Sequence, residues 1–256
     1  MSVNHGWRLG NDVVDLTSPR CLGKASHTPF LERVFSSGER EILGSLPSAD
    51  QDPALWLFWA GKEAIFKSAT KALGAPPVFR HPRFQVRFDP HELRRLAPAP
   101  PKAASACPIS GWGRYEDLGF TLRGRIGADH VHALAWMDEP QGRSPAVVWE
   151  VVRSEGAPRE GRVDAPEKLR REFTPEEWAC ISHGASARTR LAARKALADA
   201  LGVEEGRLEI RCASGKPGRR IPLAYLDGAP IPVDLTLSHD GPAMAWAFQP
   251  YRPQGR

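Results

Sequence analysis

The stretch AGKEAIFKSATKALG, from Ala60 to Gly74, has the apolar spacing of an amphipathic helix that ends at a Leu-Gly pair. A second stretch, RTRLAARKALADALG from Arg188 to Gly202, has the same character and the same ending. Glycine just beyond a helix readily adopts the left-handed conformation that caps it. The sequence therefore predicts the same long helix twice.

The segments around these two stretches repeat in the same order. RVFSSGEREIL and REFTPEEWACI precede them, RFQVRFD and RLEIR follow them, and HVHALAW and AMAWAF come last. Each of the preceding segments carries a capping box, which predicts a short helix. The capping pairs are Ser36 with Glu39 and Thr174 with Glu177. Because order and type agree, the chain is interpreted as two similar halves.

This repetition predicts an α+β fold in which each half is an antiparallel three-stranded sheet packed with helices. The turn-rich segment 138–145 has the composition of a linker, so we expect halves at 1–142 and 143–256. Such halves commonly pair as an intramolecular pseudo-dimer with a ligand groove between them, and we expect a monomer of this kind. Residues 89–108, rich in proline and alanine, are expected to form a loop or a disordered insertion.

Composition is that of an ordinary globular protein, with 25% charged and 41% hydrophobic residues. No apolar run approaches the roughly 18 residues of a membrane helix, and the first residues lack a signal peptide, so a cytoplasmic protein is expected. The net charge of +5 favours an anionic partner of some kind. The cysteines are far apart without a CxxC pair, which predicts packing residues rather than a zinc site or a disulfide framework. They are Cys21, Cys107, Cys180 and Cys212.

The first half carries a set of acidic residues. Asp12 and Asp15 lie in LGNDVVDL, which is typical of a buried strand, where a carboxylate needs a metal or a cation. Glu63 and Lys67 are four residues apart and so share a helix face, with Lys62 beside them. A strand carboxylate and a helix carboxylate can meet at Mg²⁺, which suits a pyrophosphate site. Taken singly, the Glu-Lys pair could be a surface salt bridge and Asp12 a turn residue.

The second half carries cationic and hydrogen-bonding residues that suit phosphate. Arg188 and Arg190 stand at the expected start of the long helix, and Lys216 lies in SGKPG. Ser238 and His239 end the alternating strand PVDLTLSHD, just before a glycine turn. The plainer interpretations are a turn at GKPG and a structural hydrogen bond at the histidine.

Together, GNDVVD, WAGKEAIFK, the R-x-R helix start, GKP and LSHD resemble the 4'-phosphopantetheinyl transferase superfamily over most of the chain outside the proline-rich segment. The resemblance implies that Asp12 and Glu63 bind Mg²⁺, while Lys62 and Lys67 contact the phosphates of coenzyme A. It further implies coenzyme A contacts from a second set of residues. These are Arg188, with Arg190 as a second candidate for the same role, Lys216, Ser238 and His239.

Two departures from the family pattern limit the resemblance. The halves stand in exchanged order relative to the large two-halved members, which a pseudo-dimer tolerates. Val14 stands where those members have a third acidic ligand, although the short single-unit members also lack one. We therefore expect two protein ligands plus waters, with a structural role for Asp15.

The function implied by the resemblance is transfer of the 4'-phosphopantetheine arm of coenzyme A to a serine of an apo acyl or peptidyl carrier protein. Glu63 would be the base, Lys62 and Lys67 would neutralise the leaving group, and adenosine 3',5'-bisphosphate would leave. One competing interpretation is a catalytically silent coenzyme A-binding module. Another, a nucleic-acid-binding protein, is disfavoured because the basic residues are scattered among acids. The pathway, whether fatty-acid, polyketide or nonribosomal-peptide, and the choice of Mg²⁺ or Mn²⁺ stay open.

Overall fold

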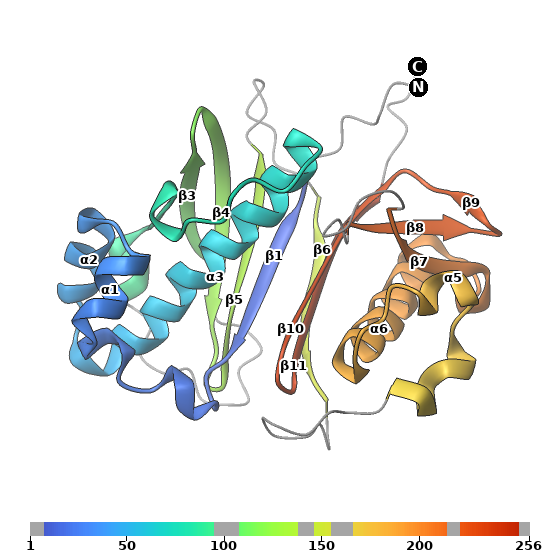
Figure 1. Ribbon diagram of the computed structural model, residues 1–256, viewed down its shortest axis with the longest axis horizontal. Helices are drawn as coiled ribbons and strands as arrows, with labels where there is room; N and C mark the ends of the chain where they lie inside the picture. Colours follow the sequence, from blue (N-terminus) through green and yellow to red (C-terminus); the bar gives the residue numbers. More distant parts are fainter. Residues whose placement is uncertain (1–7, 95–107, 138–145, 155–165, 214–220, 251–256) are drawn as a thin grey trace. The chain divides into compact units, whose positions relative to one another are not determined.

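The computed structural model describes residues 8–94, 108–137, 146–154, 166–213 and 221–250 (Figure 1). The backbone contacts divide the chain into two compact units. The N-terminal unit is Gly10–Asp138, and the C-terminal unit combines Met1–Leu9 with Glu139–Arg256. Both contain helices and antiparallel sheets, which confirms the predicted α+β class. The pseudo-dimer and its boundary at residue 142 stay predictions.

One antiparallel sheet of five strands forms the N-terminal unit, in the order β1-β5-β4-β3-β2. Its strands are β1 Gly10–Asp15, β2 Phe84–Phe88, β3 Ile109–Tyr115, β4 Leu118–Ile126 and β5 His130–Met137. The predicted three-stranded sheet is therefore too small for this unit. The difference is the glycine-containing hairpin β3–β4, which lies between β5 and β2 in the sheet.

The long helix α3, Ser48–Leu73, covers one face of this sheet (Figure 1). It ends at Gly74, whose φ of 68° is the predicted left-handed cap. The helix starts well before the predicted Ala60. The shorter helices are α1 Thr28–Val34, α2 Ser37–Gly44 and α4 Pro90–Arg94, with 3-10 turns η1 Pro19–Cys21, η2 Lys24–Ser26 and η3 His81–Arg83.

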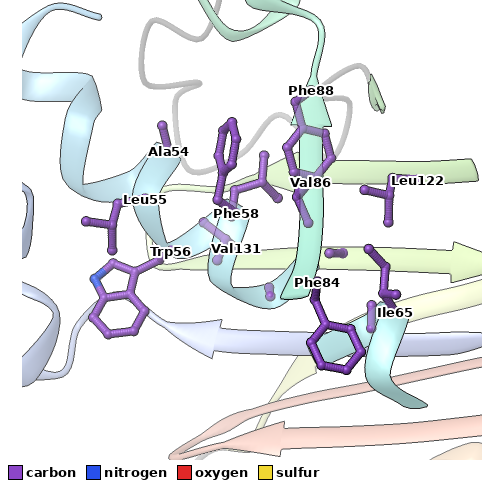
Figure 2. Packing of buried hydrophobic residues seen from close by; sticks show 14 of the residues in the cluster. Ala54, Leu55, Trp56, Phe58, Ile65, Phe84, Val86, Phe88, Leu122 and Val131 are labelled. Carbon is purple, nitrogen blue, oxygen red and sulfur yellow. The ribbon is translucent and has the colours of Figure 1, made fainter. Parts of the chain in front are cut away.

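The core of the N-terminal unit lies between α3 and the sheet. Figure 2 shows Phe58 and Ile65 of α3 beside aromatic and aliphatic side chains from the strands. Phe84, Val86 and Phe88 alternate with exposed residues along β2, so every second side chain of this strand is buried. The buried face of β2 and the buried face of α3 therefore belong to the same hydrophobic core.

Gly10 marks the closest approach of β1 to α3. A β-carbon at this position would overlap the carbonyl oxygen of Ala64 in the backbone of α3, which cannot move aside as a side chain can. Gly10→Ala is therefore expected to destabilise the protein by about 3 kcal/mol or more, in the range of severe overpacking. Urea unfolding followed by circular dichroism checks this. Gly38→Ala is the control, because a β-carbon at Gly38 meets nothing within 4 Å; equal midpoints for the two variants would contradict the prediction.

The C-terminal unit contains two three-stranded antiparallel sheets, β10-β11-β6 and β7-β8-β9. Their strands are β6 Val148–Arg153, β7 Leu208–Cys212, β8 Pro222–Leu226, β9 Ala229–Pro230, β10 Val233–Asp240 and β11 Ala243–Pro250. Helix α6, Gly184–Leu201, packs against β7, β10 and β11, and ends at the left-handed Gly202 as predicted. The other helical segments are α5 Pro175–Trp178, η4 Pro166–Glu172 and η5 Glu205–Arg207.

Several expectations concern segments that are only partly described. Residues 95–107 of the proline-rich segment and the predicted linker 138–145 lie outside the described residues. The start of the proline-rich segment is not a loop, because Pro90–Arg94 forms α4, with the Asp89 carboxylate accepting the amide of His91 at 2.7 Å. Within the described ranges, no helix combines the length and the apolar character needed to cross a membrane.

Candidate functional site

Strand β1 places Asp12 on the face that packs against α3. Because side chains alternate along a strand, Asp12 shares this face with Gly10. The Nζ atom of Lys67 donates to Asp12 Oδ1 at 2.9 Å and to the backbone oxygen of Asn11 at 2.7 Å. The side chains of Asp12 and Lys67 are 14% and 29% exposed, so the ion pair is open to solvent on one side. The predicted meeting of the strand carboxylate with α3 is therefore present.

Glu63 lies one helical turn before Lys67 and completes this cluster. Burial and, to a smaller extent, the negative charge of Asp12 raise the pKa of Glu63 to about 7, although the positive charge of Lys67 partly opposes this shift. The Coulombic effect of Asp12 means that the two carboxylates are close enough to repel each other. We call Asp12, Glu63 and Lys67 the carboxylate cluster.

The carboxylate cluster fits a divalent cation with oxygen ligands. Two carboxylates in a partly buried position repel one another, and a bound cation would relieve this cost. Mg²⁺ is commonly held by one or two carboxylates together with waters and substrate phosphates. Among the described residues, no group of three or more His, Cys, Asp or Glu side chains is arranged to hold a metal. A site here would therefore complete its coordination with waters and phosphate oxygens.

Val14 and Asp15 supply no further ligand to this cluster. Val14 shares the face of Asp12 but is 4% exposed and belongs to the hydrophobic core. Asp15 lies on the opposite face, where its Oδ1 accepts the hydroxyl of Thr17 at 2.8 Å and the Thr17 amide at 3.3 Å. These contacts shape the turn after β1.

Lys62 does not join the carboxylate cluster, and the contacts of its side chain do not support the predicted role with phosphate. The side chain is fully buried, with Nζ 2.7 Å and 2.8 Å from the two carboxylate oxygens of Glu39 and 2.6 Å from the backbone oxygen of Phe84. Burial lowers the pKa of Lys62, and Glu39 opposes that shift. Since the ammonium is enclosed by protein acceptors, Lys62 holds α3 against α2 and β2.

Glu39 is the centre of this buried arrangement, which we call the Glu39 clasp. Its carboxylate closes the capping box of α2 by accepting the Ser36 amide at 2.8 Å, and it also accepts the Val86 amide at 2.8 Å. One side chain therefore ties the start of α2, the middle of β2 and the cation of α3 together. Buried carboxylates persist in folded proteins when they are paired in this way.

Glu177 repeats the clasp in the C-terminal unit. Its carboxylate closes the capping box at Thr174 and accepts the Ile210 amide of β7 at 2.9 Å. The cation is Arg194, whose Nη1 lies 3.2 Å from Glu177. Counted from the two cap glycines, the position of Lys62 corresponds to Arg190 rather than to Arg194. Both units therefore have a buried glutamate that accepts a strand amide. In the C-terminal unit the cation comes from one helical turn further along than in the N-terminal unit.

The C-terminal unit also contains a pocket of about 220 Å³. Its lining residues are Cys180, Ser182, His183, Ser186, Thr189, Arg190, Pro222, Leu237 and His239. Arg190 is held there, with Nη1 donating to the Ser186 hydroxyl at 2.6 Å and Nη2 donating to Cys212 Sγ at 3.5 Å. The rings of His183 and His239 meet edge to face at 4.6 Å. The pocket therefore combines a guanidinium, imidazoles and hydroxyls, which all suit an anionic ligand.

Arg188 and Arg190, which were expected at the start of the helix, lie inside α6. The helix begins at Gly184 because the ring of His183 accepts the Ser186 amide at 3.3 Å and caps the N-terminus. Histidine is not among the preferred capping residues, so this start has little signal in the sequence. The same capping places Ser186 and Thr189 in the pocket, two residues that the sequence analysis missed.

The other predicted coenzyme A contacts are placed differently. His239 and Arg190 line the pocket, whereas Ser238 is 6% exposed on the opposite face of β10. Arg188 lies on α6 outside the residues that line the pocket, and Lys216 lies outside the described residues. The pocket thus brings together two of the five predicted residues.

Comparison with known proteins gives one family match. No curated protein matches the chain. The family model for the 4'-phosphopantetheinyl transferase superfamily matches residues 8–116, a segment that includes the whole carboxylate cluster and the Glu39 clasp. Residues 8–116 are therefore similar to the 4'-phosphopantetheinyl transferase superfamily, as the sequence analysis predicted.

Proposed function

We propose that the protein transfers the 4'-phosphopantetheine arm of coenzyme A to a serine hydroxyl of an apo acyl or peptidyl carrier protein. Adenosine 3',5'-bisphosphate is the second product. The observation that carries this proposal is the carboxylate cluster, which combines two repelling carboxylates and a lysine within the segment that matches the superfamily. This set of charges suits a phosphoryl transfer, where positioning and charge neutralisation supply most of the catalysis.

In this proposal Asp12 and Glu63 hold Mg²⁺, which when bound neutralises charge on the pyrophosphate. Lys67 supplies a positive charge beside them, and its partial exposure leaves room for a phosphate oxygen. Glu63 accepts the proton of the carrier serine as the hydroxyl attacks. In the metal-free site its pKa is about 7, and a bound cation would lower it, so that the carboxylate is ionised and can accept a proton at neutral pH.

We further propose that the pocket of the C-terminal unit binds the 3'-phosphate and adenine side of coenzyme A. Arg190 is the main phosphate contact, because its guanidinium is already held in place by Ser186 and needs little ordering on binding. His239 and His183 offer ring faces and nitrogen atoms to the nucleotide. Contacts from Arg188, Lys216 and Ser238 stay predictions from the family resemblance.

Intact-mass spectrometry of several apo carrier proteins, incubated with the protein, coenzyme A and Mg²⁺, tests the proposal. A gain of about 340 Da, the mass of the phosphopantetheine arm, is expected on at least one carrier. EDTA should abolish the gain, and Asp12→Asn should slow it by about 100-fold or more because a ligand and a charge are lost. Glu41→Gln, which changes an exposed carboxylate on α2, is the matched control. Coenzyme A binding without any mass gain would instead support the silent binding module.

A further inference from the structure

Cys180 and Cys212 lie next to each other in the C-terminal unit, although the sequence separates them widely. Cys180 follows α5, and Cys212 is the last residue of β7. The Cys212 amide donates to Cys180 Sγ at 2.9 Å. Burial and, to a smaller extent, a side-chain hydrogen bond with Cys212 raise the pKa of Cys180 to about 11. The expectation that these two cysteines only fill space is therefore incomplete.

Cys180 and Cys212 differ from the buried Cys21 in their exposure to solvent. Cys180 and Cys212 are partly exposed, and Cys180 lines the pocket. Cys21 differs, because it is 2% exposed and its thiol donates to the backbone oxygen of Asp15 at 3.4 Å. Cys107 lies outside the described residues. Among the described cysteines, the pair in the C-terminal unit is thus the reactive candidate.

The neighbouring groups differ between the two thiols, which indicates different roles for them in a thiol–disulfide exchange. The Arg190 guanidinium donates to Cys212 Sγ at 3.5 Å, so a negative charge on that sulfur has a cation beside it. Burial raises the pKa of Cys180, and the neighbouring Cys212 adds to this effect, so Cys180 keeps its proton more firmly. Cys212 is therefore the sulfur that attacks first, and Cys180 is the sulfur that resolves.

We propose that Cys180 and Cys212 form a modification site that reacts with low-molecular-weight disulfides to give an internal disulfide. The Cys212 thiolate attacks the small disulfide, forms a mixed disulfide and releases one small thiolate. The Cys180 thiol then loses its proton to solvent and attacks the Cys212 sulfur, which forms the protein disulfide and releases the second small thiolate. The protein loses two electrons and two protons, and the small disulfide is reduced to two thiols.

The disulfide would act on the pocket, a consequence that rests on the proposed function. It joins the segment after α5 to the end of β7, and this segment leads directly to His183 at the start of α6. It also removes the thiol that Arg190 contacts. Oxidation is therefore expected to move Arg190 and His183 away from the geometry that binds coenzyme A. Cysteine pairs in reducing compartments are commonly transient and redox-sensing rather than structural.

The chemical step is tested with the full chain carrying Cys107→Ser, treated with oxidised glutathione, alkylated and mapped by mass spectrometry. The expected product has lost about 2 Da, retains no glutathione, contains a linked Cys180–Cys212 peptide and is restored by dithiothreitol. Adding Cys180→Ser should trap glutathione on Cys212, a gain of about 305 Da, because the resolving thiol is gone. Adding Cys21→Ser should leave the reaction unchanged. Alkylation of both Cys180 and Cys212 after treatment would overturn the proposal.

Coenzyme A binding by the reduced and oxidised forms separates the two proposals. Titration calorimetry is expected to show binding about tenfold weaker or more after oxidation, with recovery on reduction. Equal affinity of the two forms would overturn the effect on the pocket. Absence of binding to the reduced form would overturn the pocket assignment under the proposed function, whereas peptide mapping still decides whether the disulfide forms.

Discussion

Glu63→Gln is expected to abolish transfer and, in the absence of divalent cations, to raise the free energy of unfolding at pH 8. The pKa of Glu63 in the folded protein, about 7, is above the ordinary value of 4.5, so its ionised form is disfavoured by folding. The stability cost is absent below about pH 4.5, grows as the pH rises and is complete above pH 7. Glutamine carries no charge at any of these pH values. The expected gain at pH 8 is roughly 2 kcal/mol, while loss of the base and ligand slows transfer by about 10³-fold or more.

Urea unfolding in EDTA at pH 4.5 and pH 8 measures the stability part of this prediction, and the carrier mass assay measures the activity part. Glu63→Gln should unfold like the parent at the lower pH and later than the parent at the higher pH. Glu41→Gln changes an exposed carboxylate and should show neither effect. If Glu63→Gln lost the same stability at both pH values, the result would contradict the view that ionised Glu63 destabilises the folded protein.

Lys62→Met is expected to lower the free energy of unfolding by about 3–5 kcal/mol, because it leaves the Glu39 carboxylate buried without a cation. Methionine keeps most of the side-chain volume, so the lost charge dominates the result. The same change at Lys67, whose side chain is 29% exposed, should cost about 1 kcal/mol or less. Urea unfolding at pH 7, followed by tryptophan fluorescence, gives both values.

The double variant Glu39→Gln/Lys62→Met tests the reason for this difference. Removing both charges together should recover part of the stability lost in Lys62→Met, since no uncompensated charge is then buried. If Lys62 instead served the phosphates, Lys62→Met would keep its stability and lose only activity. That result would overturn the Glu39 clasp as the role of Lys62.

The elements of the fold with strong local signals could be predicted from the sequence. Both capping boxes and both left-handed glycine caps lie where the sequence indicates them, because these motifs depend on contacts within a few residues. The start of α6 could not be predicted, since a histidine ring caps it. The five-stranded sheet was also missed, because the β3–β4 hairpin depends on glycines that pack closely against β2 and α3 and on the pairing of β3 with β2.

Some residues of the candidate site could also be predicted from the sequence, and others could not. The proximity of Asp12 and Glu63 could be predicted, because alternation in the strand and the helical period aim both side chains into the same layer. The contacts of Lys62 could not be predicted, because adjacent residues on a helix point about 100° apart and the partner Glu39 lies on another helix. The Cys180–Cys212 contact depends wholly on tertiary structure, so spacing in the sequence gives no sign of it.

The two units neutralise their buried glutamates with cations at different positions of the long helix. In the N-terminal unit, the cation that neutralises the buried carboxylate occupies the position of Lys62, which commits that position to the scaffold. In the C-terminal unit Arg194 has taken over this task from one turn further along the helix. The corresponding residue, Arg190, is also buried, but it lines a pocket, where its guanidinium donates to Ser186 and Cys212. With the structural cation placed one helical turn further along in the C-terminal unit, the buried carboxylate keeps its partner while Arg190 lines the pocket.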